Sequence, residues 1–206
     1  MSAPREIVVA TGNPHKVEEL RAILAPLGIV LRGLDEVGGP FPEPEETGRT
    51  FETNARIKAA AYAKATGRTV LADDSGLEVD ALGGEPGVDS AIWAGPHGTR
   101  AERDARNNAK LSERMRDVPP DRRAARFVCC MCLADSEGRV LAETRGTFEG
   151  RIGEAPRGSH GFGYDPWLWL EDAGCSSAEL SPQTKNARSH RGHAARAMAE
   201  AIRKLG

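Results

Sequence analysis

The sequence predicts an α/β protein with a central mixed sheet. Short apolar strand patterns alternate with helical patterns, a short apolar run opens the chain, and one pair of strand patterns is joined by a turn. The 206 residues suffice for one domain with a hydrophobic core, and no internal repeat or long linker divides them. We therefore expect residues 1–206 to form one α/β domain with helices flanking the sheet.

Composition and charge exclude several classes of protein. The formal net charge of −2 gives no electrostatic reason to expect duplex nucleic acid or an anionic membrane as a partner. No apolar run approaches the roughly 18 residues of a spanning helix, and residues 1–10 lack a signal-peptide pattern. Four cysteines are too sparse for a disulfide scaffold. We expect a cytoplasmic protein with reduced thiols and no membrane partner.

The first elements follow from apolar spacing. Residues 6–10 form a continuous apolar run, which is typical of a strand covered on both faces. Apolar residues at steps of three and four from Val17 to Leu27 then predict a helix that is closed by Pro26 and Gly28. After a short apolar stretch at residues 29–31, the prolines and acids of residues 35–48 predict a loop.

The middle of the chain continues the alternation. Thr50 is the predicted N-cap of a helix that ends at Gly67. Residues 70–72 are the next predicted strand, and we expect it to end directly before Asp73. Residues 99–115 are rich in alanine and mixed charges, which is typical of a surface helix.

The last third contains a hairpin and a helical end. Apolar residues on both faces of residues 126–134 predict a central strand, and turn residues 135–138 lead into a second strand over residues 139–148. Ser181 is a predicted N-cap with Pro182 in the first helical position, and we expect helix from there to the end.

A candidate anion site lies in the turn between the first strand and the first helix. Its residues are Thr11, Gly12, Asn13, Pro14, His15 and Lys16. Such a junction points backbone amides and the positive end of the helix dipole at an anion, with Lys16 as a movable cation. The turn matches neither a Walker A nor a GxGxxG motif, and an ordinary strand-to-helix turn is the alternative.

Two adjacent carboxylates, Asp73 and Asp74, follow the expected strand at the end where α/β folds place ligands. Such a pair suits a hard cation such as Mg²⁺, and a carboxylate there can act as a general base on water. An Asp-rich turn is the alternative. Glu43, Glu45 and Glu46 could complete a metal site, although taken alone they are better explained by a solvated acidic loop.

A glycine-rich loop over residues 158–166 carries Phe162 and Tyr164. Aromatic side chains freed by glycine can offer a stacking surface for a base. The alternative is a tight turn whose rings plug the edge of the core, and we favour it for Trp167 and Trp169.

Further donors gather near the end of the chain. Lys185, His190 and Arg191 could bind phosphate or carbonyl oxygens, with a basic helix surface as the alternative. Cys129 and Cys132 match CxxC spacing, but they face opposite ways on a strand, which defeats both zinc binding and dithiol chemistry.

Taken together, these motifs resemble the inosine triphosphate pyrophosphatase family. The matching segments stand in family order over nearly the whole chain: residues 10–13 with Lys16, 45–48, Phe51 with 54–55 and 58–59, 71–84 with 86–87, 156–166, and 185–186 with 189–191. The resemblance implies an elongated two-lobed α/β fold with a nucleotide cleft, and a homodimer. It also implies Mg²⁺-dependent hydrolysis of ITP, dITP and XTP to the monophosphate and pyrophosphate.

The resemblance also implies residue roles. Residues 11–16 would hold the triphosphate, Glu45 and Asp74 would bind the metal, and Asp74 would activate water. The nucleotide-binding residues would be Ser75, Phe162, Gly163, Tyr164, Asp165, Lys185, His190 and Arg191, with Phe162 stacked on the base. Donors such as Arg191 or His190 would favour a 6-oxo purine over adenine, which presents an amino donor at that edge.

Two departures and two other functions stay open. The family usually has Glu at the position of Thr53, so the helix that starts after Thr50 loses its reciprocal capping partner. The family also prefers Phe at the position of Trp169.

A pyrophosphatase for modified pyrimidine nucleotides is one alternative function. A nucleotide-binding sensor without catalysis is the other, and the acidic set at Glu45, Asp73 and Asp74 argues against it.

Overall fold

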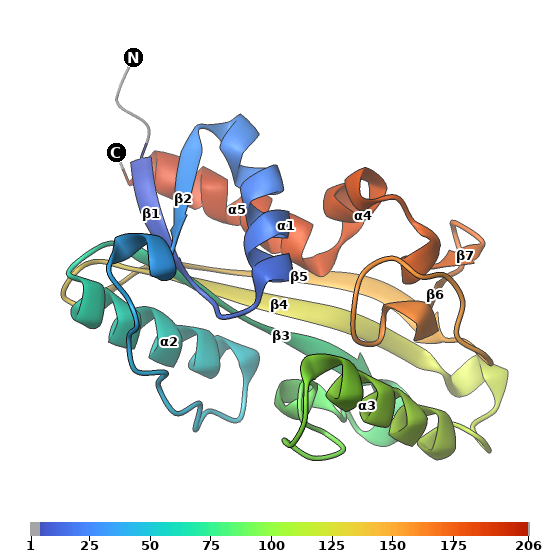
Figure 1. The fold of residues 1–206 in the computed structure, drawn as a ribbon. Helices are drawn as coiled ribbons and strands as arrows, with labels where there is room; N and C mark the ends of the chain where they lie inside the picture. The colour runs from blue at the N-terminus through green and yellow to red at the C-terminus, as the bar shows by residue number, and fades with distance from the viewer. Residues whose placement is uncertain (1–4, 206) are drawn as a thin grey trace. The chain divides into compact units, whose positions relative to one another are not determined.

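The structure is a computed structural model that describes residues 5–205 (Figure 1). Within that range, seven strands form one sheet in the order β2-β1-β3-β4-β5-β6-β7. The strands are β1 (Arg5–Ala10), β2 (Ile29–Gly33), β3 (Val70–Val79), β4 (Ala124–Ala134), β5 (Val140–Ile152), β6 (Leu168–Leu170) and β7 (Cys175–Ser176). The helices are α1 (Pro14–Leu24), α2 (Phe51–Thr66), α3 (Arg100–Arg114), α4 (Pro182–Arg188) and α5 (His190–Lys204).

The sheet is mixed, as predicted. β1 pairs in parallel with β2 and β3, whereas β6 pairs antiparallel with β5 and β7. The short turn between β4 and β5 makes them a hairpin, because a parallel pair needs a long crossover. The predicted α/β class is therefore confirmed.

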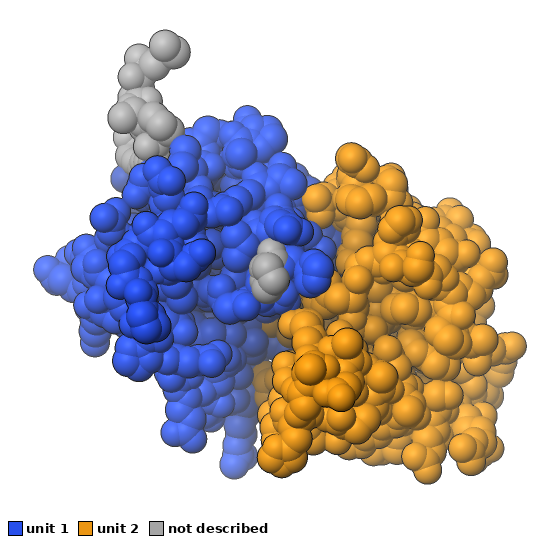
Figure 2. Space-filling model, viewed as in Figure 1, with its two compact units in different colours: residues 1–74, 129–146, 189–206 blue, residues 75–128, 147–188 orange. Residues whose placement is uncertain are grey.

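The chain divides into two compact units (Figure 2). Unit 1 contains residues 1–74, 129–146 and 189–206, and unit 2 contains residues 75–128 and 147–188. Each unit is built from segments that are far apart in the sequence. No helix among the described residues is long and apolar enough to cross a membrane.

Unit 1 has a core on each face of its strands. α1 and α5 pack together over one apolar cluster, which includes Leu20, Met131 and Met198. α2 covers a second cluster with Ala59 and Cys132, and Figure 1 shows α2 on the opposite side of the strands from α1 and α5. Both faces of β4 are thus buried, which confirms the prediction of a central strand.

Unit 2 has a core of its own. Leu111 of α3, Leu77 of β3 and Ile152 of β5 pack in one apolar cluster that also contains Tyr164 and Trp167. Trp167 is 8% exposed, so the expectation that this ring fills the core is confirmed.

Helix ends follow the predicted capping chemistry. The Thr50 hydroxyl accepts a hydrogen bond from the Thr53 amide, and the helix ends at Gly67 in the left-handed conformation. Thr53 still interacts with the N-cap of α2, because its hydroxyl lies within hydrogen-bond distance, 2.9 Å, of the Thr50 hydroxyl. For Pro14, which begins α1, the structure describes the backbone alone, so its predicted contact with a nucleotide lies outside what is described.

Two differences from the predicted boundaries bear on the site. β3 does not end before Asp73 but continues to Val79, so the paired carboxylates lie within a strand. The strand can continue because cationic side chains neutralise Asp73 and Asp74 there. The C-terminal helical region is also broken, because Ser189 adopts an extended backbone and caps a separate helix, α5.

Candidate active site

Asp73 lies at the centre of a buried ion network in unit 1. Its Oδ2 atom lies 2.8 Å from Lys16 Nζ and 3.5 Å from Arg191 Nη2, and it accepts a hydrogen bond from the Cys129 thiol at 3.8 Å. Burial alone would raise the pKa of this carboxyl, but the charges of Lys16 and Arg191 outweigh burial and hold the pKa well below its usual range. Asp73 is therefore ionised at neutral pH and fixes the position of Lys16.

Asp74 has a different environment. Its Oδ1 atom accepts a hydrogen bond from Lys58 Nζ at 3.1 Å, and its Oδ2 atom accepts one from Asn54 Nδ2 at 3.3 Å. Burial raises the pKa of this carboxyl, and the positive charges of Lys58 and Lys16 offset only part of that effect. A buried carboxylate with a raised pKa is suited to accept a proton from water near neutral pH.

The turn from Thr11 to Lys16 is held by its own amides. The Asn13 amide donates to Thr11 Oγ1, the His15 amide to Asn13 Oδ1, and the Lys16 amide to the Asn13 carbonyl. Asn13 Nδ2 is buried and has no hydrogen-bond partner among the described residues, whereas Gly12 is exposed. Any anion site here would therefore rest on Lys16 and the Asn13 side chain rather than on those three amides.

The first turn of α5 holds His190 and Arg191 in unit 1. Arg191 is 1% exposed, and its guanidinium donates to the Glu19 carboxylate as well as pairing with Asp73. β5 approaches this turn at Gly146, where a Cβ atom would lie 2.2 Å from the His190 carbonyl oxygen. Only glycine fits that approach, so Gly146 sets where the first turn of α5 lies.

The acidic loop before α2 contributes Glu46 rather than Glu45 to this network. Glu46 Oε2 lies 2.9 Å from Lys58 Nζ, while the Glu45 side chain is exposed and has no described contact with Asp74. The described residues contain no group of three or more His, Cys, Asp and Glu side chains arranged to hold a metal ion. Nevertheless, Asp74 and Glu46 direct carboxylate oxygens at one ammonium group, and oxygen ligands of this chemistry fit a hard cation such as Mg²⁺. The predicted ligand role of Glu45 stays a prediction.

In unit 2, Asp165 organises the glycine-rich loop. Its carboxylate accepts hydrogen bonds from Ser177 Oγ at 2.7 Å, Lys185 Nζ at 2.6 Å and the Phe162 amide at 2.8 Å. Asp165 is 2% exposed and Lys185 is 5% exposed, so this ion pair is internal. The structure therefore gives both residues a positioning role in the loop, and direct nucleotide contact by either stays a prediction.

The remaining predicted residues of unit 2 differ in accessibility. Phe162 is half-buried, and the guanidinium carbon of Arg100 lies 4.8 Å from its ring centroid. Tyr164 is buried and its hydroxyl donates to the Ser90 carbonyl oxygen, so it is a core residue in this structure. Ser75 is half-buried and follows Asp74 directly in β3.

Sequence reasoning gave no role to Asn54, Lys58 or Ser177. Asn54 accepts from the Gly48 amide and donates to Asp74, so it joins the acidic loop to that carboxylate. Asn54 and Lys58 are four residues apart beside the apolar stripe of α2, which places both on the side that faces the sheet. That spacing, together with the match of residues 54–55 and 58–59 to segments of the family, was the available signal. Ser177 had none, because its contact with Asp165 joins segments that no local pattern connects.

Comparisons with known proteins identify the family of this chain. The model of the Ham1 family matches residues 7–201. This chain belongs to the Ham1 family. Ham1-family relatives include a dITP/XTP pyrophosphatase of Nitratidesulfovibrio vulgaris, 51% identical over 94% of each chain, and one of Exiguobacterium sibiricum, 47% identical over 96% of each. A solved HAM1 protein of Coxiella burnetii is 39% identical, with a TM-score of 0.85 over 97% of this chain and 99% of the other.

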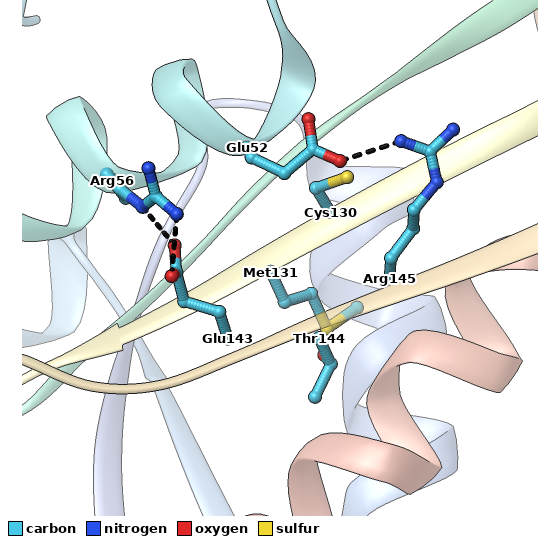
Figure 3. Close-up of a pocket in the computed structure, with 7 residues that line it drawn as sticks. All are labelled: Glu52, Arg56, Cys130, Met131, Glu143, Thr144 and Arg145. Atoms are coloured by element: carbon cyan, nitrogen blue, oxygen red, sulfur yellow. Dashed lines mark hydrogen bonds and ion pairs between the residues drawn. The ribbon is translucent and has the colours of Figure 1, made fainter.

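This Ham1-family chain also has a cavity that the sequence did not indicate. It lies in unit 1, has a volume of about 130 Å³, and is lined by Glu52, Arg56, Cys130, Met131, Glu143, Thr144 and Arg145. Figure 3 shows that Glu52 pairs with Arg145 and Glu143 with Arg56 across it. Burial and the neighbouring Glu52 carboxylate raise the pKa of the Cys130 thiol to about 12, so that thiol is a poor nucleophile.

Proposed function

We propose that this chain is a nucleoside triphosphate pyrophosphatase that converts ITP, dITP and XTP to the monophosphate and pyrophosphate. The observation that carries the proposal is Asp74, a buried carboxylate with a raised pKa, held by Lys58 and Asn54 beside the ionised Asp73–Lys16 pair. The names of Ham1-family relatives, which are dITP/XTP pyrophosphatases, support the choice of substrate.

Each residue of unit 1 then has a defined task. Asp74 accepts the proton of the attacking water while the new phosphorus–oxygen bond forms and the anhydride bond between the α and β phosphorus atoms breaks. Lys16, fixed by Asp73, neutralises phosphate charge. Arg191 keeps Asp73 ionised, and Lys58 keeps the Asp74 oxygens in place.

The proposal includes Mg²⁺ as cofactor. Asp74 would hold the ion together with Glu45, and Glu46, the next residue of that loop, pairs with Lys58. When bound, Mg²⁺ neutralises and orients the phosphates. A homodimer, which the family resemblance implies, and the cytoplasmic location expected from the sequence complete the proposal.

The residues of unit 2 would serve the base. Phe162 would stack on the purine, with its loop held by the Asp165–Lys185 pair. The role of His190 and Arg191 as donors for a 6-oxo group stays a prediction, since Arg191 is 1% exposed and paired with Glu19 and Asp73. This division of roles assigns phosphate chemistry to unit 1 and base stacking to unit 2.

The experiment is a nucleotide panel. The protein is incubated with Mg²⁺ and ITP, dITP, XTP, GTP, ATP and pyrimidine triphosphates, and pyrophosphate and orthophosphate are measured separately. We expect pyrophosphate from ITP, dITP and XTP. Orthophosphate from every nucleotide would contradict the proposal, pyrophosphate only from pyrimidine nucleotides would indicate the other pyrophosphatase, and binding without either product would indicate a sensor.

A further inference from the structure

In unit 2, side chains of helix α3 form hydrogen bonds with the loop that carries Phe162. Asn108 Nδ2 donates to the Gly163 carbonyl oxygen at 3.0 Å, and the Gly163 amide donates to Asp104 Oδ2 at 3.2 Å. Both backbone polar groups of Gly163 are therefore bound by side chains that lie one helical turn apart on α3. This double contact fixes α3 beside Phe162.

Arg100 lies one turn before Asp104 on α3, directly over the Phe162 ring. The guanidinium carbon is 4.8 Å from the ring centroid, which is cation–π distance. Lys185 Nζ is also near the ring, at 5.3 Å, but its charge is committed to Asp165. Of these two cations beside the Phe162 ring, Arg100 is therefore the one without a short ion pair to a described residue.

The other contacts of Arg100 are weak. Its Nε atom lies 3.7 Å from Asp104 Oδ2, which is too long for a hydrogen bond. Nε is also buried with no hydrogen-bond partner among the described residues, although the side chain as a whole is 40% exposed. A buried donor without an acceptor costs stability, so the arrangement favours a ligand that brings one.

We propose that Arg100 is a substrate-contacting residue that covers the purine stacked on Phe162. This inference rests on the proposed function. A guanidinium is planar and weakly hydrated, so it stacks on an aromatic face and on a base face alike. When a base takes its place on Phe162, the guanidinium moves outward, stacks on the free face of the base, and offers its unpaired Nε–H to a nucleotide acceptor.

The role predicts affinity rather than choice of base. Every purine has a face that a guanidinium can cover, so the contact strengthens binding of inosine and xanthine nucleotides alike. Discrimination between a 6-oxo purine and adenine depends on donors other than Arg100. The chemistry at Asp74 is unaffected, so the contribution appears in KM and not in kcat.

The test compares Arg100→Ala with Arg103→Ala, a matched control on the same helix whose Nη1 donates to the Gly98 carbonyl oxygen. We expect Arg100→Ala to raise KM for both ITP and XTP about tenfold with little change in kcat, and Arg103→Ala to change neither. Arg100→Lys keeps the charge but not the planar group, and we expect it to recover only part of the loss. Unchanged KM values, a loss confined to one base, or an equal effect of Arg103→Ala would overturn the proposal.

A second measurement excludes a merely structural effect. Binding of inosine monophosphate is measured by calorimetry for wild type, Arg100→Ala, Phe162→Leu and the double variant. If the base lies between the two side chains, the losses of binding free energy in the two single variants do not add up to the loss in the double variant, because either change alone removes the stacked arrangement. Additive losses would overturn the role of Arg100 even where the folding of each variant is intact.

The outcomes separate this inference from the proposed function. If wild-type protein neither hydrolyses nor binds ITP, the proposed function itself fails. If wild type releases pyrophosphate from ITP and Arg100→Ala behaves as wild type, only the inference about Arg100 fails.

Discussion

Each unit buries a carboxylate, Asp73 in unit 1 and Asp165 in unit 2, but the two differ in how many of their oxygens have hydrogen-bond partners. In unit 2, Asp165 is saturated by Ser177, Lys185 and the Phe162 amide. In unit 1, Asp73 Oδ1 and Asn13 Nδ2 have no partners among the described residues, although charged groups surround them. A saturated network fixes a shape, whereas unsatisfied polar atoms beside opposing charges leave capacity for a ligand. The contrast between these two carboxylates supports the proposed division of roles, in which Asp73 lies beside the phosphate site and Asp165 holds the loop of Phe162 in place.

The largest expected effect comes from removing the proposed base. Asp74→Asn keeps the size of the side chain but cannot accept a proton, so kcat for ITP should fall by roughly 10² to 10⁴-fold. Asp135→Asn is the control, because that carboxylate lies in the turn before β5 and pairs with Arg139. Near-normal turnover in Asp74→Asn, with wild-type stability, would end the assignment of chemistry to this residue.

Unit 2 should respond in stability rather than in the chemical step. Asp165→Asn leaves the buried Lys185 cation without its counter-charge, so the free energy of unfolding should fall by about 3 kcal/mol. Ser177→Ala removes one donor from the same carboxylate and should cost about 1 kcal/mol. Urea denaturation monitored by tryptophan fluorescence measures both. If Asp165→Asn lowered kcat as strongly as Asp74→Asn without loss of stability, the division between the units would be wrong.

The smallest effect separates two neighbouring glutamates. Glu46 pairs with Lys58 at a half-exposed position, so Glu46→Gln should change stability by less than about 1 kcal/mol. Glu45→Gln should instead raise the Mg²⁺ concentration needed for half-maximal activity, because Glu45 is the proposed ligand. A magnesium titration of the two variants decides which carboxylate serves the ion. A larger shift in Glu46→Gln would transfer the ligand role to that residue.

Local patterns predicted most of the fold. Thr50 and Gly67 marked both ends of α2, and the two apolar faces of residues 126–134 marked a central strand. The strand through Asp73 was missed because polar residues weaken a strand pattern, and the cations that neutralise them come from α1, α2 and α5. The break at Ser189 was missed because helical spacing continues on both sides of it.

The site was predictable as a set of residues but not as a set of partners. Motif order brought Lys16, Asp74 and Arg191 to attention, yet their contacts join segments that are distant in the chain. No local spacing could show that Arg191 is buried against Glu19, or that Glu46 rather than Glu45 contacts Lys58. Such pairings depend on tertiary packing, and only the folded chain supplies them.

The pH dependence of kcat/KM for ITP tests the central claim most directly. Asp74 must be ionised to accept a proton, and burial raises its pKa above the ordinary carboxyl value while Lys58 lowers it. As the pH is lowered, kcat/KM should therefore begin to fall at a higher pH than it would for a base with the pKa of an ordinary aspartate. Lys58→Met removes the lowering charge and should move this acid limb to higher pH, whereas Lys58→Arg should leave it near its wild-type position. An acid limb that stays in place in Lys58→Met, or moves to lower pH, would contradict Asp74 as the base.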